Sequence, residues 1–168
     1  AAYNVEKFMD EALSSLTCPE ILDDIEIIIV NDGSKDSTAD IAKRYVEKYP
    51  DSFFLIDKNN GGYGSTINAS IVEASGKYFR LLDGDDWFDK EEFTKYVKAL
   101  KEVNTDLVIT DFVKRIQTNK EEKTDDKYWF YKKNYKHIIP FIFRKNRKLN
   151  FTYFIASKNK RINDIRDI

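Results

Sequence analysis

Residues 81–88 read L-L-D-G-D-D-W-F, so three aspartates stand within four positions directly after an apolar run. Carboxylates this close raise each other's pKa unless a cation neutralises them. Asp83, Asp85 and Asp86 offer only oxygen ligands, which Mg2+ and Mn2+ prefer, and Mg2+ commonly combines one or two carboxylates with substrate phosphates. The cluster therefore predicts a divalent metal site, with an acidic turn that caps the following helix as the structural alternative.

A calcium loop of the EF-hand type is a competing interpretation of the same segment. Counted from Asp83, the position that requires glycine holds Phe88. The position that requires a bidentate glutamate holds Thr94. The EF-hand interpretation is therefore excluded.

Gly61, Gly62 and Gly64 lie in the segment K-N-N-G-G-Y-G-S-T-I-N, between a predicted strand and a predicted helix. Glycines let the backbone approach a ligand closely, and the following helix offers free N–H groups to an anion. A dinucleotide fingerprint is an alternative because Asp83 lies about 20 residues further on, but Ile67 occupies the third glycine position. A P-loop is excluded because no G-K-[ST] is present. A tight structural connection remains the other interpretation.

A third polar turn, N-D-G-S, follows the apolar run I-E-I-I-I-V. These residues are ordinary turn formers, which is the structural interpretation. Asp32 also stands just past a strand, where a carboxylate can accept hydrogen bonds from a nucleobase or a ribose. Both interpretations stay open on the residues alone.

The elements that position these loops alternate in type. Strands are expected over about 25–30, 52–56, 77–82 and 106–113, because these runs are apolar and rich in β-branched or aromatic residues. Helices are expected over about 5–16, from 36 or 37 to 49, from the glycine segment to 75, and over 90–103. Expected end signals are Asn4, Asp36 or Ser37 as N-caps, Gly76 as a C-terminal stop, and a capping box of Asp89 and Glu92.

This alternation predicts an α/β fold with a mostly parallel sheet and helices on both faces. In such sheets, ligands bind outside the carboxyl ends of the strands. Residues 31–38, 59–64 and 83–86 all follow strands at that edge. The sequence therefore predicts that the three polar loops meet at one rim.

Composition and charge divide the chain into two parts. With 168 residues, 42% hydrophobic and 14% aromatic, it suits one folded domain, and no apolar run reaches the roughly 18 residues of a membrane span. Residues 1–113 hold 12 Lys and Arg against 23 Asp and Glu, whereas residues 114–168 hold 16 against 6, giving nets of −11 and +10. The second part is basic and aromatic. We expect a loop over 117–127 and leave helix or strand open for 128–154.

Taken together, four segments resemble a family 2 glycosyltransferase of the GT-A (Rossmann-like) fold. A-A-Y-N-V-E-K-F-M resembles the family's P-x-Y-N-x-E, and I-I-I-V-N-D-G-S-K-D-S-T resembles V-D-D-G-S-x-D-x-T. L-L-D-G-D-D-W-F resembles L-D-x-D-D, and N-G-G-Y-G-S-T-I-N stands where the family has N-x-G-x-x-x-A-R-N. The resemblance covers residues 1 to about 113, the expected nucleotide-sugar-binding part, with 114–168 as an acceptor-side or accessory segment.

The resemblance implies a role for each matched residue. Asp85 is implied as the direct ligand of Mn2+ or Mg2+, with Asp83 beside it and near the ribose and diphosphate. Asp86 is implied to lie close to the sugar, and Asp32 to hold the base or ribose. The remaining donor-binding residues implied are Ala2, Tyr3, Glu6, Asn60, Gly61, Gly62 and Asn68.

The implied activity is metal-dependent, inverting transfer of a sugar from a nucleotide sugar, expected to be UDP-linked, to a saccharide or lipid-linked acceptor. The implied location is cytoplasmic, with peripheral contact to the inner face of a membrane and no nucleic acid partner. Three departures from the family stand out: its first strand precedes Ala1, Ile67 replaces its arginine, and its acidic base motif has no clear counterpart. Acids beyond the matched part, none of which fits that motif, are Asp111, Asp125, Asp126, Asp164 and Asp167.

Two other classes compete with this interpretation. A nucleotidyltransferase-like enzyme also uses acids, a metal and a parallel sheet, but it should carry a basic glycine-rich loop near its N-terminus, and none is seen. A non-enzymatic module would use the basic segment, 114–168, to bind nucleic acid or a membrane.

Overall fold

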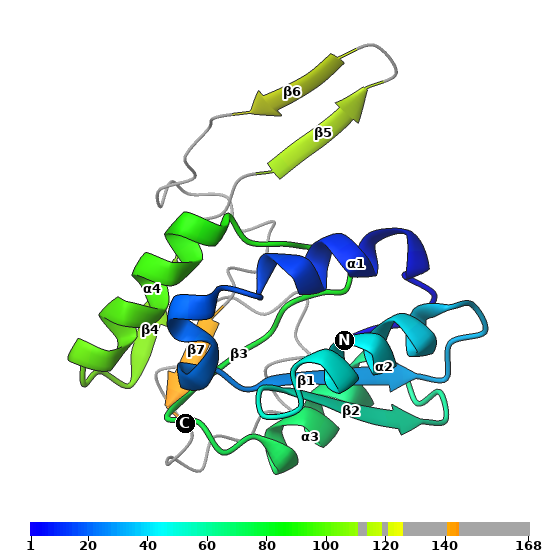
Figure 1. The fold of residues 1–168 in the computed structure, drawn as a ribbon, viewed down its shortest axis with the longest axis horizontal. Helices are drawn as coiled ribbons and strands as arrows, with labels where there is room; N and C mark the ends of the chain where they lie inside the picture. Colours follow the sequence, from blue (N-terminus) through cyan, green and yellow to red (C-terminus); the bar gives the residue numbers. More distant parts are fainter. Residues whose placement is uncertain (111–113, 119–120, 126–140, 145–168) are drawn as a thin grey trace, which may run out of the picture.

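The computed structural model describes residues 1–110, 114–118, 121–125 and 141–144. The elements, in chain order, are α1 (Glu6–Ser15), the 3₁₀ helix η1 (Pro19–Asp24), β1 (Ile27–Asp32), α2 (Thr38–Lys48), β2 (Phe53–Lys58), α3 (Tyr63–Glu73), β3 (Tyr78–Arg80), α4 (Lys90–Glu102), β4 (Leu107–Ile109), β5 (Lys114–Thr118), β6 (Glu121–Asp125) and β7 (Phe141–Arg144) (Figure 1). Within these residues, no helix combines the length and apolar character that crossing a membrane requires.

β1 and β2 form a parallel pair that runs in register from Ile27 opposite Phe53 to Asp32 opposite Lys58. The chain around Ala2 lies beside β1 in the same direction, because Ala2 N donates to the Val30 carbonyl at 2.9 Å. Isoleucine and valine favour extended backbone and fill both sides of a covered strand. The carboxyl ends of β1 and β2 therefore deliver Asp32 and Lys58 to the same edge.

β3 and β4 belong to a second sheet with the order β3-β7-β4. Both strands pair antiparallel with β7, so they run parallel to each other on either side of it. The structure thus confirms the α/β class and adds a strand from the segment where helix and strand were both open. The other residues of 128–154 lie outside the described part.

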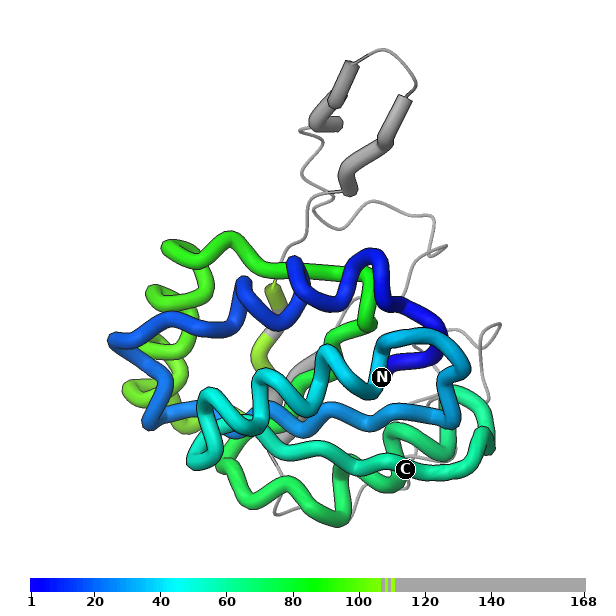
Figure 2. Tube along the Cα trace, turned by 45° about the vertical axis from the view of Figure 1, so that its right-hand side comes forward, coloured from blue at the N-terminus to red at the C-terminus, as the bar shows by residue number. Residues whose placement is uncertain are grey.

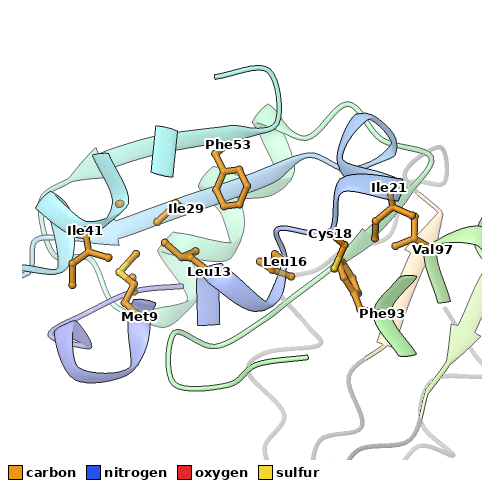
Figure 3. Packing of buried hydrophobic residues seen from close by; sticks show 12 residues of the cluster. Met9, Leu13, Leu16, Cys18, Ile21, Ile29, Ile41, Phe53, Phe93 and Val97 are labelled. Carbon is orange, nitrogen blue, oxygen red and sulfur yellow. The ribbon is translucent and has the colours of Figure 1, made fainter. Parts of the chain in front are cut away.

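Helices cover both sides of β1 and β2. Figure 2 shows α1 and α2 on one side of these strands and α3 on the other. The core joins Met9 and Leu13 of α1 to Ile29, Ile41 and Phe53 (Figure 3). It continues toward α4, where Cys18, Ile21, Phe93 and Val97 are buried. Apolar side chains at helical spacing thus fix α1, α2 and α4 around one core.

Asn4 does not cap α1, contrary to expectation. It has a φ of 52°, and its side-chain oxygen accepts from Lys35 N at 2.8 Å. The donor at the start of α1, Glu6 N, is instead bound by Oδ2 of Asp36 at 3.1 Å. A cap from a distant loop replaces the local cap because tertiary packing brings Asp36 to the end of the helix.

Other predicted helix ends had mixed outcomes. Asp89 caps α4 as expected, since its Oδ1 accepts from Glu92 N at 3.0 Å. Gly76 is not the C-cap of α3, because the helix ends at Glu73 and Ala74 already turns to extended backbone. The helix α3 therefore ends without a glycine in the left-handed conformation.

The prediction of a loop over 117–127 was wrong for the described residues of that range. There, β5 and β6 form an antiparallel hairpin. Its register places Lys114 opposite Asp125 and Gln117 opposite Glu122. The segment lacks the alternation of apolar residues that signals a strand. Two strands of a hairpin pair through hydrogen bonds between backbone groups of residues that are close in the sequence. A polar sequence therefore does not exclude this pairing.

Candidate functional site

The carboxylate of Asp32 is buried at the end of β1, with 3% of the residue exposed. It accepts hydrogen bonds from Gly61 N at 2.9 Å, from Gly62 N at 2.8 Å and from Lys58 Nζ. Burial alone would raise the pKa of Asp32, but the bonds from Lys58, Gly61 and Gly62 outweigh it and lower that pKa. Asp32 is thus a charged anchor for residues 59–62, the glycine loop.

Gly33 brings the loop after β1 against the glycine loop. Its φ is 71°, and a Cβ at this position would lie 2.8 Å from Asn60 N. A side chain is excluded by both conditions, because other residues rarely adopt this backbone and the neighbouring atom belongs to the main chain. The predicted meeting of these two loops is confirmed.

Tyr63 connects the glycine loop to residues 83–86, the acidic loop. Its hydroxyl group donates to Oδ1 of Asp83 at 2.9 Å. Burial and the negative charge of Asp83 raise the pKa of Tyr63, so the phenol keeps its proton. The acidic loop also packs on the first residues of the chain, since a Cβ on Gly84 would lie 2.9 Å from both the Ala1 carbonyl oxygen and Val5 Cγ2. The three polar loops therefore lie together, although β3 belongs to a different sheet from β1 and β2.

The acidic loop carries the charge crowding that the sequence predicted. Partial burial, and then the charges of Asp85 and Asp83, raise the pKa of Asp86. No ion pair of the described residues neutralises these three carboxylates. Within the same residues, no three acidic, histidine or cysteine side chains form a complete ligand set. A site of one or two carboxylates completed by phosphate oxygens fits this arrangement.

The other predicted residues lie in different settings. Ala2 is buried beside β1, whereas Tyr3 is 49% exposed. Glu6 uses its carboxylate to accept from Ser37 N at 2.9 Å. Asn60 and Asn68 are exposed, on the glycine loop and on α3. No described contact brings Asn68 to the acidic loop.

Sequence reasoning missed Lys58 and Tyr63. Lys58 was visible as a cation between the strand predicted over 52–56 and the first glycine, Gly61. Tyr63 was visible as an aromatic residue inside G-G-Y-G. Ile67, which stands where the resemblance expects a cation, is 1% exposed on α3. Lys58 instead brings a positive charge to this edge.

Comparison with known families identifies the family of the chain. A model described as Glycosyl transferase family 2 matches residues 1–162. The chain belongs to glycosyl transferase family 2. Membership in family 2 favours the glycosyltransferase interpretation over the nucleotidyltransferase.

Family 2 relatives match this chain over part of their own length. EpsH of Bacillus subtilis is 33% identical over 144 residues, 85% of this chain and 41% of EpsH. A poly(ribitol-phosphate) beta-glucosyltransferase of Bacillus spizizenii is 36% identical over 112 residues, 64% of this chain and 17% of that protein. The chain thus spans less than half of each.

A solved structure shows the same fold. S. aureus TarS 1–349 is similar with a TM-score of 0.51 and 30% identity, covering 64% of this chain and 32% of that chain. TarS 1–349 has also been solved in complex with UDP-GlcNAc, and that structure gives a TM-score of 0.50. The expected GT-A fold is confirmed.

Proposed function

We propose that residues 1–113 bind a nucleotide sugar, UDP-linked, and that the intact enzyme transfers its sugar to an acceptor. The observation that carries this proposal is the convergence of three loops, in which Asp32 holds Gly61 and Gly62 while Tyr63 holds Asp83. The TarS complex with UDP-GlcNAc supports a UDP-linked donor.

The proposed donor site has two ends. Asp32, the first residues of the chain and the glycine loop would form the nucleoside end, and the acidic loop would form the diphosphate and sugar end. The residues proposed for donor contact are Ala2, Tyr3, Glu6, Asp32, Asn60, Gly61, Gly62, Asn68, Asp83 and Asp86. Tyr63 would keep Asp83 oriented toward that second end.

We propose Asp85, together with Asp83, as the protein ligands of Mn2+ or Mg2+. The exposed carboxylates of the acidic loop form no ion pair with another described residue, and Asp86 already has a raised pKa. When bound, such an ion supplies Lewis-acid stabilisation of the departing diphosphate. Asp83 and Asp85 would hold the diphosphate end in place, and Asp86 would contact the sugar.

For the acceptor, we propose a class of molecule and the part of the chain that contacts it. Residues 114–168, with their net charge of +10, would face a saccharide or lipid-linked acceptor or an anionic membrane surface at its cytoplasmic side. The poly(ribitol-phosphate) beta-glucosyltransferase among the relatives supports a cell-envelope polymer as the acceptor class. Transfer would invert the anomeric centre by one displacement, with a carboxylate as general base on the acceptor hydroxyl group.

Calorimetry with UDP, in the presence and absence of Mn2+, tests the donor site. We expect Mn2+ to strengthen UDP binding, and Asp85→Ala to weaken the Mn2+-dependent binding by at least about tenfold, or ~1.4 kcal/mol. Glu47→Ala, which removes an exposed carboxylate on α2, is the matched control and should leave binding unchanged. If the affinity for UDP changes neither with Mn2+ nor with Asp85→Ala, the proposed metal site is contradicted.

A further inference from the structure

Lys58, the last residue of β2, carries an ammonium group that contacts three different segments. Its Nζ donates to a carboxylate oxygen of Asp32, to the Asn59 carbonyl oxygen at 2.7 Å and to Ser65 Oγ at 2.9 Å. An ammonium group has three N–H donors, so these bonds use all of them. The side chain of Lys58 is 26% exposed and that of Asp32 is 4% exposed. The pair is therefore largely withdrawn from water.

The carboxylate of Asp32 serves the lysine and the glycine loop at the same time. It accepts from Gly61 N and Gly62 N in addition to Lys58. A carboxylate offers about four acceptor positions, so about one remains for a ligand. The direction of that remaining position depends on where Lys58 and the loop hold the carboxylate.

The loop is shaped around the ammonium group. A Cβ on Gly61 would lie 3.1 Å from Lys58 Nζ and 2.7 Å from Ser65 Oγ. Ser65 Oγ in turn donates to the Gly62 carbonyl oxygen at 2.8 Å. The network thus closes on itself across β1, β2, the glycine loop and the first turn of α3.

Stability alone does not explain this arrangement. A buried ion pair is weak evidence for stabilisation, because removing two charges from water costs about as much as their attraction returns. The three contacts of this ammonium group, to Asp32 of β1, Asn59 of the glycine loop and Ser65 of α3, instead specify one loop conformation. Ser65 accepts from this ammonium group, and the backbone of Gly61 lies against it.

We infer that Lys58 is a positioning residue of the donor site: it fixes the glycine loop and orients the free acceptor position of Asp32. This inference rests on the proposed function. Without the ammonium group, Asp32 loses one of its three described donors, and Ser65 loses its link to β2. The loop then samples other conformations, and the nucleoside end of the site is no longer preformed.

The loop itself supplies the first test, without any ligand. Amide hydrogen exchange of Gly61 and Gly62, measured by NMR on the full chain, should accelerate at least about tenfold in Lys58→Met, because the anchored state opens more often. Lys101→Met is the matched control, since it removes the ion pair at 2.8 Å between Lys101 of α4 and Asp24 of η1. Unchanged exchange at both glycines in Lys58→Met overturns the inference.

Binding supplies the second test. With Mn2+ present, Lys58→Met should raise the Kd of UDP about tenfold, but in an Asp32→Asn background less than about twofold, because the lysine acts through Asp32. Equal effects in both backgrounds overturn the inference, since a residue that contacts UDP independently would give them. If the wild-type chain binds no UDP, the proposed function fails, and the exchange measurement still decides the positioning role.

Discussion

At the residue scale, Gly33 and Gly64 differ in whether glycine is required at their positions. Gly33 combines a φ of 71° with a main-chain neighbour that leaves no space for a Cβ. Gly64 lies in the first turn of α3, and nothing is found within 4 Å of a Cβ there. The sequence shows glycine at both positions, but only the backbone conformation and the neighbouring atoms of Gly33 make glycine necessary there.

Gly33→Ala should therefore destabilise the protein by about 1–3 kcal/mol, the usual cost of a strained backbone. Gly64→Ala is the matched control and should be neutral or stabilising by up to about 1 kcal/mol, because alanine favours a helix over glycine. Urea unfolding of both variants measures the difference. Equal stability of the two variants would show that the loop after β1 can move away from Asn60.

At the element scale, the N-termini of α1 and α2 cap each other. Asp36 accepts from Glu6 N at 3.1 Å and from Thr38 N at 3.0 Å, so one carboxylate serves both helices. Glu6 accepts from Ser37 N at 2.9 Å in return. Burial alone would raise the pKa of Asp36, but the bonds from Thr38 and Glu6 outweigh it and lower that pKa. This exchange of caps fixes how the first residues of the chain meet the loop after β1.

Asp36→Ala should cost about 1–2 kcal/mol at neutral pH, because it removes the acceptor for two helix N-termini. The folded-state pKa of Asp36 lies below its ordinary value of 3.8, so the carboxylate stabilises the fold above that value. Its contribution is lost as the pH falls through the lower, folded-state pKa. Urea unfolding at about pH 7 and about pH 2.5 should therefore show a smaller effect of the substitution in acid. Asp40→Ala, which loses only an exposed pair with Lys43, is the control.

At the scale of the whole molecule, the proposed donor site combines loops that follow strands of two different sheets. Asp32 and the glycine loop follow β1 and β2, whereas the acidic loop follows β3 of the β3-β7-β4 sheet. The hydrogen bond between Tyr63 and Asp83 joins the two loops directly. A ligand that contacts both loops therefore depends on their relative placement, which no single element determines.

Tyr63→Phe should weaken Mn2+-dependent UDP binding several-fold, because Asp83 loses its donor and its orientation. Stability should change by less than about 1 kcal/mol, since Tyr63 is 48% exposed and one hydrogen bond contributes about that much. Tyr45→Phe, which removes the bonds to Asp10 on α1, is the control for a lost phenol far from the site. Unchanged UDP binding by Tyr63→Phe would mean that the acidic loop is positioned without it.

Local signals explain what could be predicted. The β-branched run before Asp32, the helical spacing of Ile41 and Ala42, and the cap at Asp89 act over a few residues, so the sequence alone predicted those elements. Strand β7 and the β5–β6 hairpin were not predicted, because their pairing is decided by partners rather than by their own pattern.

The sequence by itself determined the alternation of strands and helices from α1 to β4, and therefore which polar loops follow the ends of strands. Only the tertiary structure decided what those loops do to one another. Asp32 is held by Lys58 and two glycine amides, and Asp36 caps a helix that begins thirty positions earlier. Such contacts join residues far apart in the chain, and their energies depend on burial and geometry that no local pattern records.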